Sequence, residues 1–401
     1  MTHTTEYPTR YMRDRARAAR TTAPLRPFAW PSPDATESEA RAMRRALLER
    51  DEPSAALVRA IREDRTVTLG QFRRALAEGI DAVPDAPEPL RAYFAMLEAT
   101  PDWVDRDLLA LGARTLRRVG SDVGDVLAYG SLLGGYNNSG PLPVLTSSGR
   151  LTGERTRRRI AETGTWWNGC VADGGLDRFG EGFRLSVHVR LMHAFVGYHH
   201  EHETDWDSGA RGLPVNQFDQ AGTLGLFSIT FLLHTRVLGV RYTRREADAV
   251  LHLWCYVGWL MGVDRRWLPF DERAGLRMMY QIGASSPQPT NTATRWPPPS
   301  WTCRCTPTTP VPATAPPLPV RAGLSLATTL LGPAGVRALR VPVRPPWYPL
   351  ARLAVNVPKH HVLARFPAGR PWVQRLGERR LEQAAQRILD GEIPDVVALP
   401  D

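Results

Sequence analysis

The sequence lacks three features that define common protein classes. No run of about 18 apolar residues is present, so no segment has the length of a conventional transmembrane helix. The N-terminal stretch contains no apolar segment of the kind found in a secretory signal peptide. Cysteines are too few and too scattered for a disulfide framework; they are Cys170, Cys255, Cys303 and Cys305. We therefore expect a cytoplasmic protein.

Lysine is almost absent, since Lys359 is the only lysine among 51 basic residues. The prevalence of arginine, alanine, glycine and proline indicates GC-rich codon usage, so the net charge of +10 is weak evidence for an acidic ligand. The excess charge is also local. From Arg273 to Gly377 there are thirteen basic residues and no acidic one, whereas the rest of the chain has 38 basic and 41 acidic residues. A basic field over the whole protein is excluded, and we expect no nucleic-acid partner.

Helical patterns fill most of the chain. Apolar residues recur at three- and four-residue spacing in several segments between residues 37 and 120, and again over 121–136, 154–172, 216–238 and 244–262. Thr152–Glu154, Asn216 and Thr243 fit helix caps. Hairpin dipeptides and a βαβ rhythm are missing from the sequence. The stretch 183–191 fits a strand as well as a helix, but the pattern as a whole predicts an all-α protein.

Composition divides the chain into four parts. Residues 1–35 are polar and interrupted by proline, which indicates an arm packed on another part, and residues 36–286 hold the helical body. Residues 287–319 contain eleven prolines, many threonines and no acidic residue. This segment is interpreted either as a Pro/Thr-rich linker or as a stretch translated out of frame, because a shifted reading of GC-rich codons gives an amphipathic helix. Residues 320–401 form a C-terminal helical extension.

The last strong helical pattern lies at 371–393. Its apolar residues share one face, which predicts that the helix packs on the body; they are Trp372, Leu376, Leu381, Ala384, Ala385 and Ile388. We do not favour contact with a membrane surface, because the polar face of this helix carries charges of both signs.

The most informative interval is 149–200. If residues 154–172 form a helix, Arg159, Glu162 and Thr163 share one face, where a cation, a carboxylate and a hydroxyl would meet. The alternative is a solvated polar stripe with a weak surface ion pair between the first two.

His193 lies among apolar residues in the segment LMHAFV. A buried imidazole requires a partner, which can be a backbone carbonyl, a carboxylate or a metal. A zinc site with His200, two turns further along the helix, is an alternative that we rank low.

Other polar and aromatic residues of the central segments have simpler interpretations. Asp219 and His252 are secondary candidates, which could instead cap a helix and satisfy a buried carbonyl, respectively. Core or cofactor-wall positions are expected for four tryptophans, which are Trp166, Trp167, Trp254 and Trp259.

Several motifs occur here in the order found in the family that groups the fungal MpaB oxygenase with the bacterial rubber oxygenases, the latex-clearing proteins. They are Gly149–Leu151, Arg159-x-x-Glu162-Thr163, Val189–Ala194, LPVNQFDQAGTL at 213–224 and HLWCYVGWLMGV at 252–263, preceded by blocks at 8–28 and 131–140. The resemblance covers roughly residues 8–280, weakens across 287–319 and is loose afterwards.

The resemblance implies a globin-like all-α core around one non-covalent haem b. It implies that His193 is the proximal iron ligand, that Arg159 and Thr163 lie near the haem and support activity, and that Glu162 matches a proposed base. It also implies cleavage of isoprenoid C=C bonds by dioxygen.

The residues themselves are compatible with this chemistry. A neutral imidazole is a common haem ligand, and a single axial ligand leaves the other face of the iron open for dioxygen. The sequence contains no Cys-x-x-Cys-His motif for covalent haem attachment. In a water-poor pocket, Glu162 could have a raised pKa and act as a general base.

We therefore expect an oxidoreductase, a haem-dependent oxygenase or dioxygenase acting on a small apolar, isoprenoid or lipid-like substrate. Two alternatives remain at this point. One is a haem-binding sensor or carrier without turnover. The other is a non-haem helical protein in which His193 is a core residue. The sequence does not indicate the oligomeric state.

Overall fold

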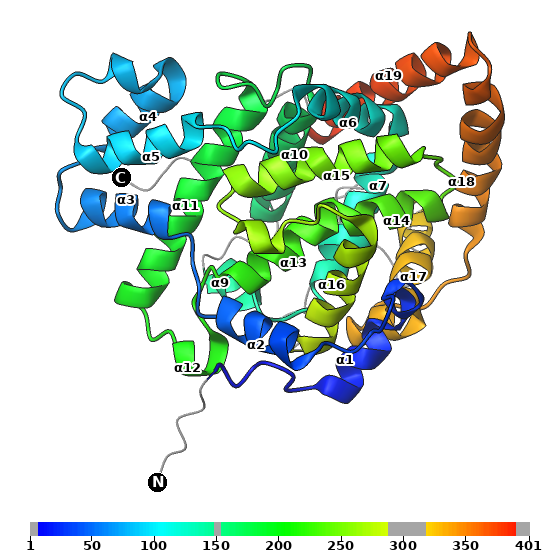
Figure 1. Ribbon diagram of the computed structural model, residues 1–401. Helices are drawn as coiled ribbons and strands as arrows, with labels where there is room; N and C mark the ends of the chain where they lie inside the picture. Colours follow the sequence, from blue (N-terminus) through cyan, green and yellow to red (C-terminus); the bar gives the residue numbers. More distant parts are fainter. Residues whose placement is uncertain (1–6, 148–153, 288–317, 390–401) are drawn as a thin grey trace.

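The protein is helical throughout the part that the computed structural model describes, which is residues 7–147, 154–287 and 318–389 (Figure 1). Within these ranges there is no strand, so the predicted all-α class is confirmed and residues 183–191 are helical. The α-helices are α1 (Arg15–Thr21), α2 (Glu37–Ala46), α3 (Glu52–Arg62), α4 (Leu69–Glu78), α5 (Glu88–Glu98), α6 (Arg106–Val119), α7 (Asp122–Asp125), α8 (Leu133–Gly135), α9 (Leu142–Ser147), α10 (Glu154–Val171), α11 (Glu181–Glu203), α12 (Ser208–Arg211), α13 (Gln217–Phe227), α14 (Ile229–Val237), α15 (Arg244–Leu260), α16 (Glu272–Ser285), α17 (Leu318–Ala338), α18 (Trp347–Val357) and α19 (Gly369–Leu389).

Short turns of other helix types connect these elements. They are the 3-10 turns η1 (Ala23–Phe28), η2 (Ile80–Ala82), η4 (Arg265–Trp267) and η8 (Leu363–Arg365), and the π-helical turns η3 (Val126–Leu132) and η7 (Pro358–Val362). The predicted helix over 216–238 is two helices, because Ser228 leaves helical geometry between α13 and α14 (φ −105°, ψ −88°). No helix of the described residues is long and apolar enough to cross a membrane.

Two helices begin at the capping residues that were predicted from the sequence. Thr243 accepts a hydrogen bond from the backbone N–H of Glu246, whose carboxylate accepts one in return, so a complete capping box begins α15. Asn216 caps α13 by accepting from the N–H of Asp219. Both residues were predicted as caps, whereas Thr152 lies outside the described residues.

The core is centred on α15, whose residues Val250, Leu251, Leu253 and Trp254 are fully buried. Helix α6 packs closely against α15, because Gly112 has no side chain: a Cβ atom there would lie 2.4 Å from the carbonyl oxygen of Ala249. Helices α10 and α11 pack on each other and on this central pair. The core therefore brings the two predicted site helices side by side.

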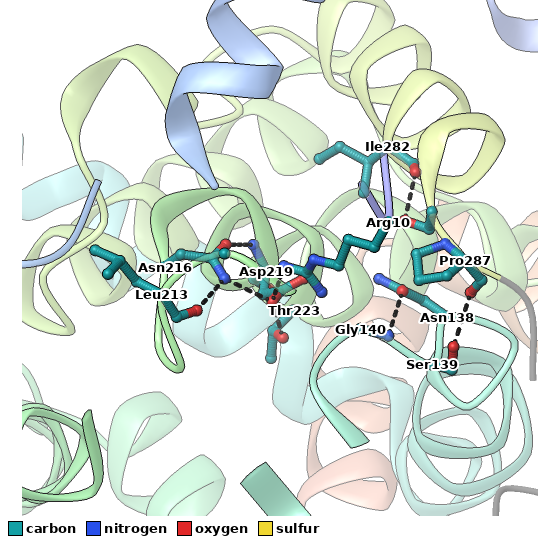
Figure 2. Close-up of polar contacts among 12 residues, drawn as sticks. Arg10, Asn138, Ser139, Gly140, Leu213, Asn216, Asp219, Thr223, Ile282 and Pro287 are labelled. Atoms are coloured by element: carbon teal, nitrogen blue, oxygen red, sulfur yellow. Dashed lines mark hydrogen bonds and ion pairs between the residues drawn. The ribbon is translucent and has the colours of Figure 1, made fainter. Parts of the chain in front are cut away.

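The N-terminal arm is fastened to the body at several points. The N–H groups of Thr9 and Arg10 donate to the carbonyls of Gly209 and Ala210, and the N–H of Met12 donates to Ser285. The guanidinium group of Arg10 reaches inward to Asp219, as Figure 2 shows. The exact division into arm, body, segment 287–319 and extension stays a prediction, and residues 288–317, on which the linker and out-of-frame interpretations depend, lie outside the described residues.

Helix α19 packs on α6, so the predicted docking on the body is confirmed, but Trp372 of the predicted face is 44% exposed. Leu381 is buried as predicted, together with Val373 and Gly377. The other described residues of the predicted face are half-buried; they are Leu376, Ala384 and Ala385. A Cβ atom at Gly377 would lie 2.4 Å from the carbonyl oxygen of Arg118. Close approach at this glycine sets the rotation of the helix, which places Trp372 on the outside.

Candidate functional site

Helices α10 and α11 form an antiparallel pair whose register can be followed residue by residue. A Cβ atom on Gly182 would lie 2.6 Å from Cα of Cys170, and one turn further the indole N–H of Trp166 donates to the hydroxyl of Ser186 over 2.9 Å. Each turn toward the start of α10 therefore corresponds to one turn toward the end of α11. Continued in this way, the register brings Arg159 in α10 to the level of His193 in α11.

Glu162 lies near the middle of α10, with 11% of its side chain exposed. Its carboxylate accepts a hydrogen bond of 3.0 Å from the guanidinium group of Arg158, one turn earlier. The structure pairs Glu162 with Arg158, whereas the spacing suggested Arg159, whose side chain lies outside the described part of the structure. Arg158 is 62% exposed, so solvent screens the pair strongly.

The structure describes the other two predicted residues of α10, Thr163 and Arg159, in less detail. Thr163 follows Glu162 in the helix and is half-buried. Arg159 belongs to α10, but its side chain lies outside the described part of the structure. The common location of the three residues on one helix is therefore established, whereas their convergence on one spot stays a prediction.

His193 is half-buried on α11 and lines a cavity of about 210 Å³ that is partly open to solvent. Ala194 and Gly197 of the same helix line this cavity as well. The opposite wall includes the two residues directly before α3 and one residue within it, which are Arg50, Asp51 and Arg59. Three further side chains contribute, from Val215, Gln220 and Met261. His193 thus lies at the boundary between a helix core and a polar cavity.

Buried ion pairs fix the wall of this cavity. The guanidinium group of Arg190 makes two hydrogen bonds to the carboxylate of Asp51, of 2.6 and 2.7 Å, and its side chain is 5% exposed. Arg50 bonds Glu201 over 2.5 Å. Burial raises the pKa of Tyr93, beneath Arg190, to about 12, so this ring stays neutral. The pairs join α3 to α11 and hold the cavity open between them.

Little in the sequence indicates the residues that form this wall. Arg190 lies within the motif that surrounds His193, but its partner Asp51 is 139 positions away, in a segment without any recognisable pattern. Gln220 lies next to Asp219, which was predicted as a secondary candidate. These residues can be identified only from their contacts in the folded structure.

The secondary candidates have structural partners. Asp219 accepts hydrogen bonds from Arg10 over 2.7 Å and from the side-chain amide of Asn216 over 2.8 Å (Figure 2). His252 accepts through Nε2 from the backbone N–H of Asp105 over 2.9 Å, so it satisfies an amide and not a carbonyl. Its pKa is lowered mainly by burial.

The histidines after His193 diverge along α11. His199 bonds the carboxylate of Glu203 over 2.6 Å, and Nδ1 of His202 lies 2.9 Å from the carbonyl oxygen of Tyr198. His200 is buried against the ring of Trp206. Across the described residues, no three His, Cys, Asp or Glu side chains are grouped as a metal ion would require.

Aromatic side chains fill the space between α10, α13 and α15. The rings of Trp166, Phe227 and Trp254 contact one another, with centroid distances of 5.3 to 5.8 Å. Trp167 is 2% exposed and packs near Phe231. These residues form a rigid apolar wall beside the site helices.

Comparison with known proteins gives consistent matches. The family described as ER-bound oxygenase mpaB/B'/Rubber oxygenase, catalytic domain, matches residues 117–366, so the match extends further toward the C-terminus than the motifs suggested. The rubber oxygenase of Streptomyces sp. (strain K30) is 27% identical over 193 residues, which are 46% of this chain and 45% of that protein. The chain thus matches about half the length of this relative.

The fold also has a close counterpart among solved structures. The latex clearing protein LCP in the closed state superimposes with a TM-score of 0.61 at 19% identity, over 85% of this chain and 91% of that one. At 19% identity, this likeness shows only that the helices of the two proteins are arranged similarly.

Proposed function

The chain belongs to the family of ER-bound MpaB oxygenases and rubber oxygenases, and from this premise we propose that it is a haem b-dependent oxygenase that cleaves or oxidises C=C bonds of a small apolar substrate. The observation that carries the proposal is the position of His193, which lines a cavity and belongs to α11, the helix that packs against α10, where Glu162 lies. One imidazole and one carboxylate are thereby placed on adjoining helices.

The donor set around His193 suits a haem. A haem brings four nitrogen ligands of its own and requires only an axial ligand from the protein, whereas a bare zinc ion requires three or four protein ligands. His193 supplies one imidazole. The guanidinium groups of Arg50 and Arg59 line the same cavity and suit carboxylates such as haem propionates. When bound, haem b would supply the iron that activates dioxygen.

The residues of α10 would perform the acid–base and orienting work. The Glu162 carboxylate is nearly buried beside Arg158, so it is a suitable acceptor for an allylic proton of the substrate. Thr163 carries a hydroxyl that can donate a hydrogen bond to an oxygen atom. At the level of His193, Arg159 would supply a cation for a propionate or for developing negative charge.

The substrate we propose is an isoprenoid or lipid-like alkene. The relatives' printed names refer to rubber and to latex. Oxidative cleavage would place one atom of dioxygen on each carbon of the broken double bond, giving two carbonyl ends. The aromatic wall around Trp166 and Trp254 would give α10 an apolar flank suited to such a substrate.

The test combines a spectrum with a turnover assay. The purified protein, supplied with haem, should show a Soret band and should consume dioxygen with a panel of isoprenoid and unsaturated lipid alkenes, forming carbonyl products. A Soret band without alkene-dependent oxygen consumption would identify a sensor or carrier. If haem failed to bind at all, His193 would be an ordinary core residue and the proposal would be wrong.

A further inference from the structure

The C-terminal part of the molecule carries an unusual concentration of exposed apolar side chains. Of the seventeen large hydrophobic residues that are exposed among the described residues, nine lie between positions 343 and 372. They are Val343, Trp347, Leu350, Val355, Val357, Val362, Leu363, Phe366 and Trp372. Scattered apolar residues are normal on a protein surface, but a contiguous group marks an interaction site.

Helix α18 shows how this surface arises. Trp347, Leu350 and Val355 follow one another at helical spacing and are 40%, 58% and 54% exposed. Beyond α18, Val362 at the end of η7 and Phe366 directly after η8 are also exposed, at 52% and 59%. We call these five residues the outer stripe. Figure 1 places α18 at the periphery of the described part of the molecule.

The opposite side of α18 fastens the helix to the body through polar groups. Arg352 bonds Asp122 over 2.5 Å, and Asn356 donates to Asp122 over 2.7 Å and to the carbonyl of Leu238 over 2.9 Å. Tyr348 donates to Asp125 over 2.6 Å. Because these bonds fix the rotation of α18, the outer stripe cannot turn inward.

Charge around the outer stripe has one sign. The segment from Arg273 to Gly377 contains no carboxylate, and Arg344 and Arg365, which flank the stripe in the chain, are exposed. Neither arginine forms an ion pair with a described residue. Apolar side chains with tryptophan and phenylalanine among them, flanked by arginine, are the composition of protein segments that lie in the interface of an anionic bilayer.

We propose that the outer stripe docks this protein on the surface of an anionic lipid membrane. Trp347, Leu350 and Phe366 would enter the region between headgroups and acyl chains, and Arg344 and Arg365 would contact lipid phosphates and carboxylates. A second copy of the chain is a poor occupant, because a two-fold contact would place arginines against arginines without acidic residues from this segment to pair with them. This surface is distinct from the face of α19 on which a membrane contact was not favoured.

The experiment measures binding of the full chain to vesicles by co-sedimentation. We expect binding to vesicles of phosphatidylcholine mixed with phosphatidylserine, and much weaker binding to phosphatidylcholine alone. The combined variant Trp347→Ser, Leu350→Ser and Phe366→Ser should lose more than about a hundredfold in affinity. Its matched control replaces equally exposed residues of the same types elsewhere: Trp30→Ser, Leu48→Ser and Phe179→Ser.

A second pair of variants tests the charge. Arg344→Gln combined with Arg365→Gln should weaken binding to the anionic vesicles roughly 25-fold, about fivefold for each arginine, and added salt should have a similar effect. The control is Arg41→Gln combined with Arg74→Gln, two exposed arginines far from the stripe. Circular dichroism establishes that each variant is folded.

Three results would overturn the proposal. The first is a failure of the wild-type chain to bind anionic vesicles, and the second is equal binding by the stripe variant and its control. The third is a lipid-independent dimer that the stripe variant dissociates, which would identify a second copy as the occupant. None of these measurements needs haem or turnover, so their outcome is independent of the proposed oxygenase activity.

Discussion

Helices α11 and α18 both turn polar side chains inward, with different consequences. In α11, Arg190 and His193 line the same cavity. In α18, Arg352 and Asn356 are both bonded to Asp122. Inward polar groups therefore line a candidate reaction site in one helix and form an anchor in the other.

The outward faces differ as well. Beyond the cavity, α11 exposes His199 and Glu203, which pair with each other, whereas α18 exposes the apolar outer stripe. The polar and apolar faces of α18 are thus reversed relative to an ordinary surface helix. Strong polar bonds to the body make this reversal stable.

The largest expected effect is on cofactor binding by α11. His193→Ala should abolish stoichiometric haem in the folded protein, because His193 is proposed as the only protein ligand of the iron. The Soret absorbance per protein measures this. His199→Ala is the matched control and should retain the full haem content, since His199 pairs with Glu203 on the exposed side. A folded His193→Ala protein with full haem would instead point to His188, His199 or His200.

The next effect concerns chemistry on α10. Glu162→Gln preserves the volume and hydrogen-bonding capacity of the side chain but removes the base, so alkene turnover should fall by about two to four orders of magnitude with an almost unchanged haem spectrum. Glu203→Gln, an exposed site on α11, should have little effect. Wild-type turnover in the Glu162 variant would show that the base lies elsewhere.

The next effect is on the free energy of unfolding, and it tests the polar bonds that hold α18 to the body. Asp122→Ala leaves Arg352 and Asn356 without their shared acceptor, so the free energy of unfolding should fall by about 3–5 kcal/mol in urea titrations. Asp102→Ala removes a carboxylate that is 90% exposed, and should change stability by less than about 0.5 kcal/mol. Equal effects of the two substitutions would contradict the proposed anchoring.

The smallest expected effect concerns the contact between α19 and α6 at Gly377. Gly377→Ala forces a methyl group toward the carbonyl of Arg118 and should destabilise the protein by about 1–3 kcal/mol. Gly70→Ala in α4 has only one neighbour, at 3.8 Å, and should stabilise by up to about 1 kcal/mol. A neutral Gly377→Ala would mean that the two helices separate easily.

Local features of the sequence predicted the fold class and most helix positions. Capping residues such as Thr243 and Asn216 are recognisable because their side chains bond backbone groups within three residues. The exposure of Trp372 on α19 was not predicted, because it depends on a backbone contact at Gly377 that apolar periodicity does not reveal.

The candidate site was predictable only in part. Helix spacing placed Glu162 and Thr163 together, and the family motifs singled out His193. The bonds between Asp51 and Arg190 could not be predicted, because the two residues are 139 positions apart in the sequence and meet only in the folded structure. The bond of Glu162 to Arg158 was also missed, because it depends on the side-chain conformation of an exposed arginine.

The arm has a consequence for the order in which the chain folds. Arg10 is synthesised before Asp219, which lies 209 positions later, and the partner of the Met12 amide is Ser285. The arm therefore cannot complete its attachment until residue 285 has been synthesised. Before Arg10 docks, Asp219 lacks this guanidinium partner, and the described side chain that still bonds its carboxylate is that of Asn216. The arm thus completes a structure that later parts of the chain begin.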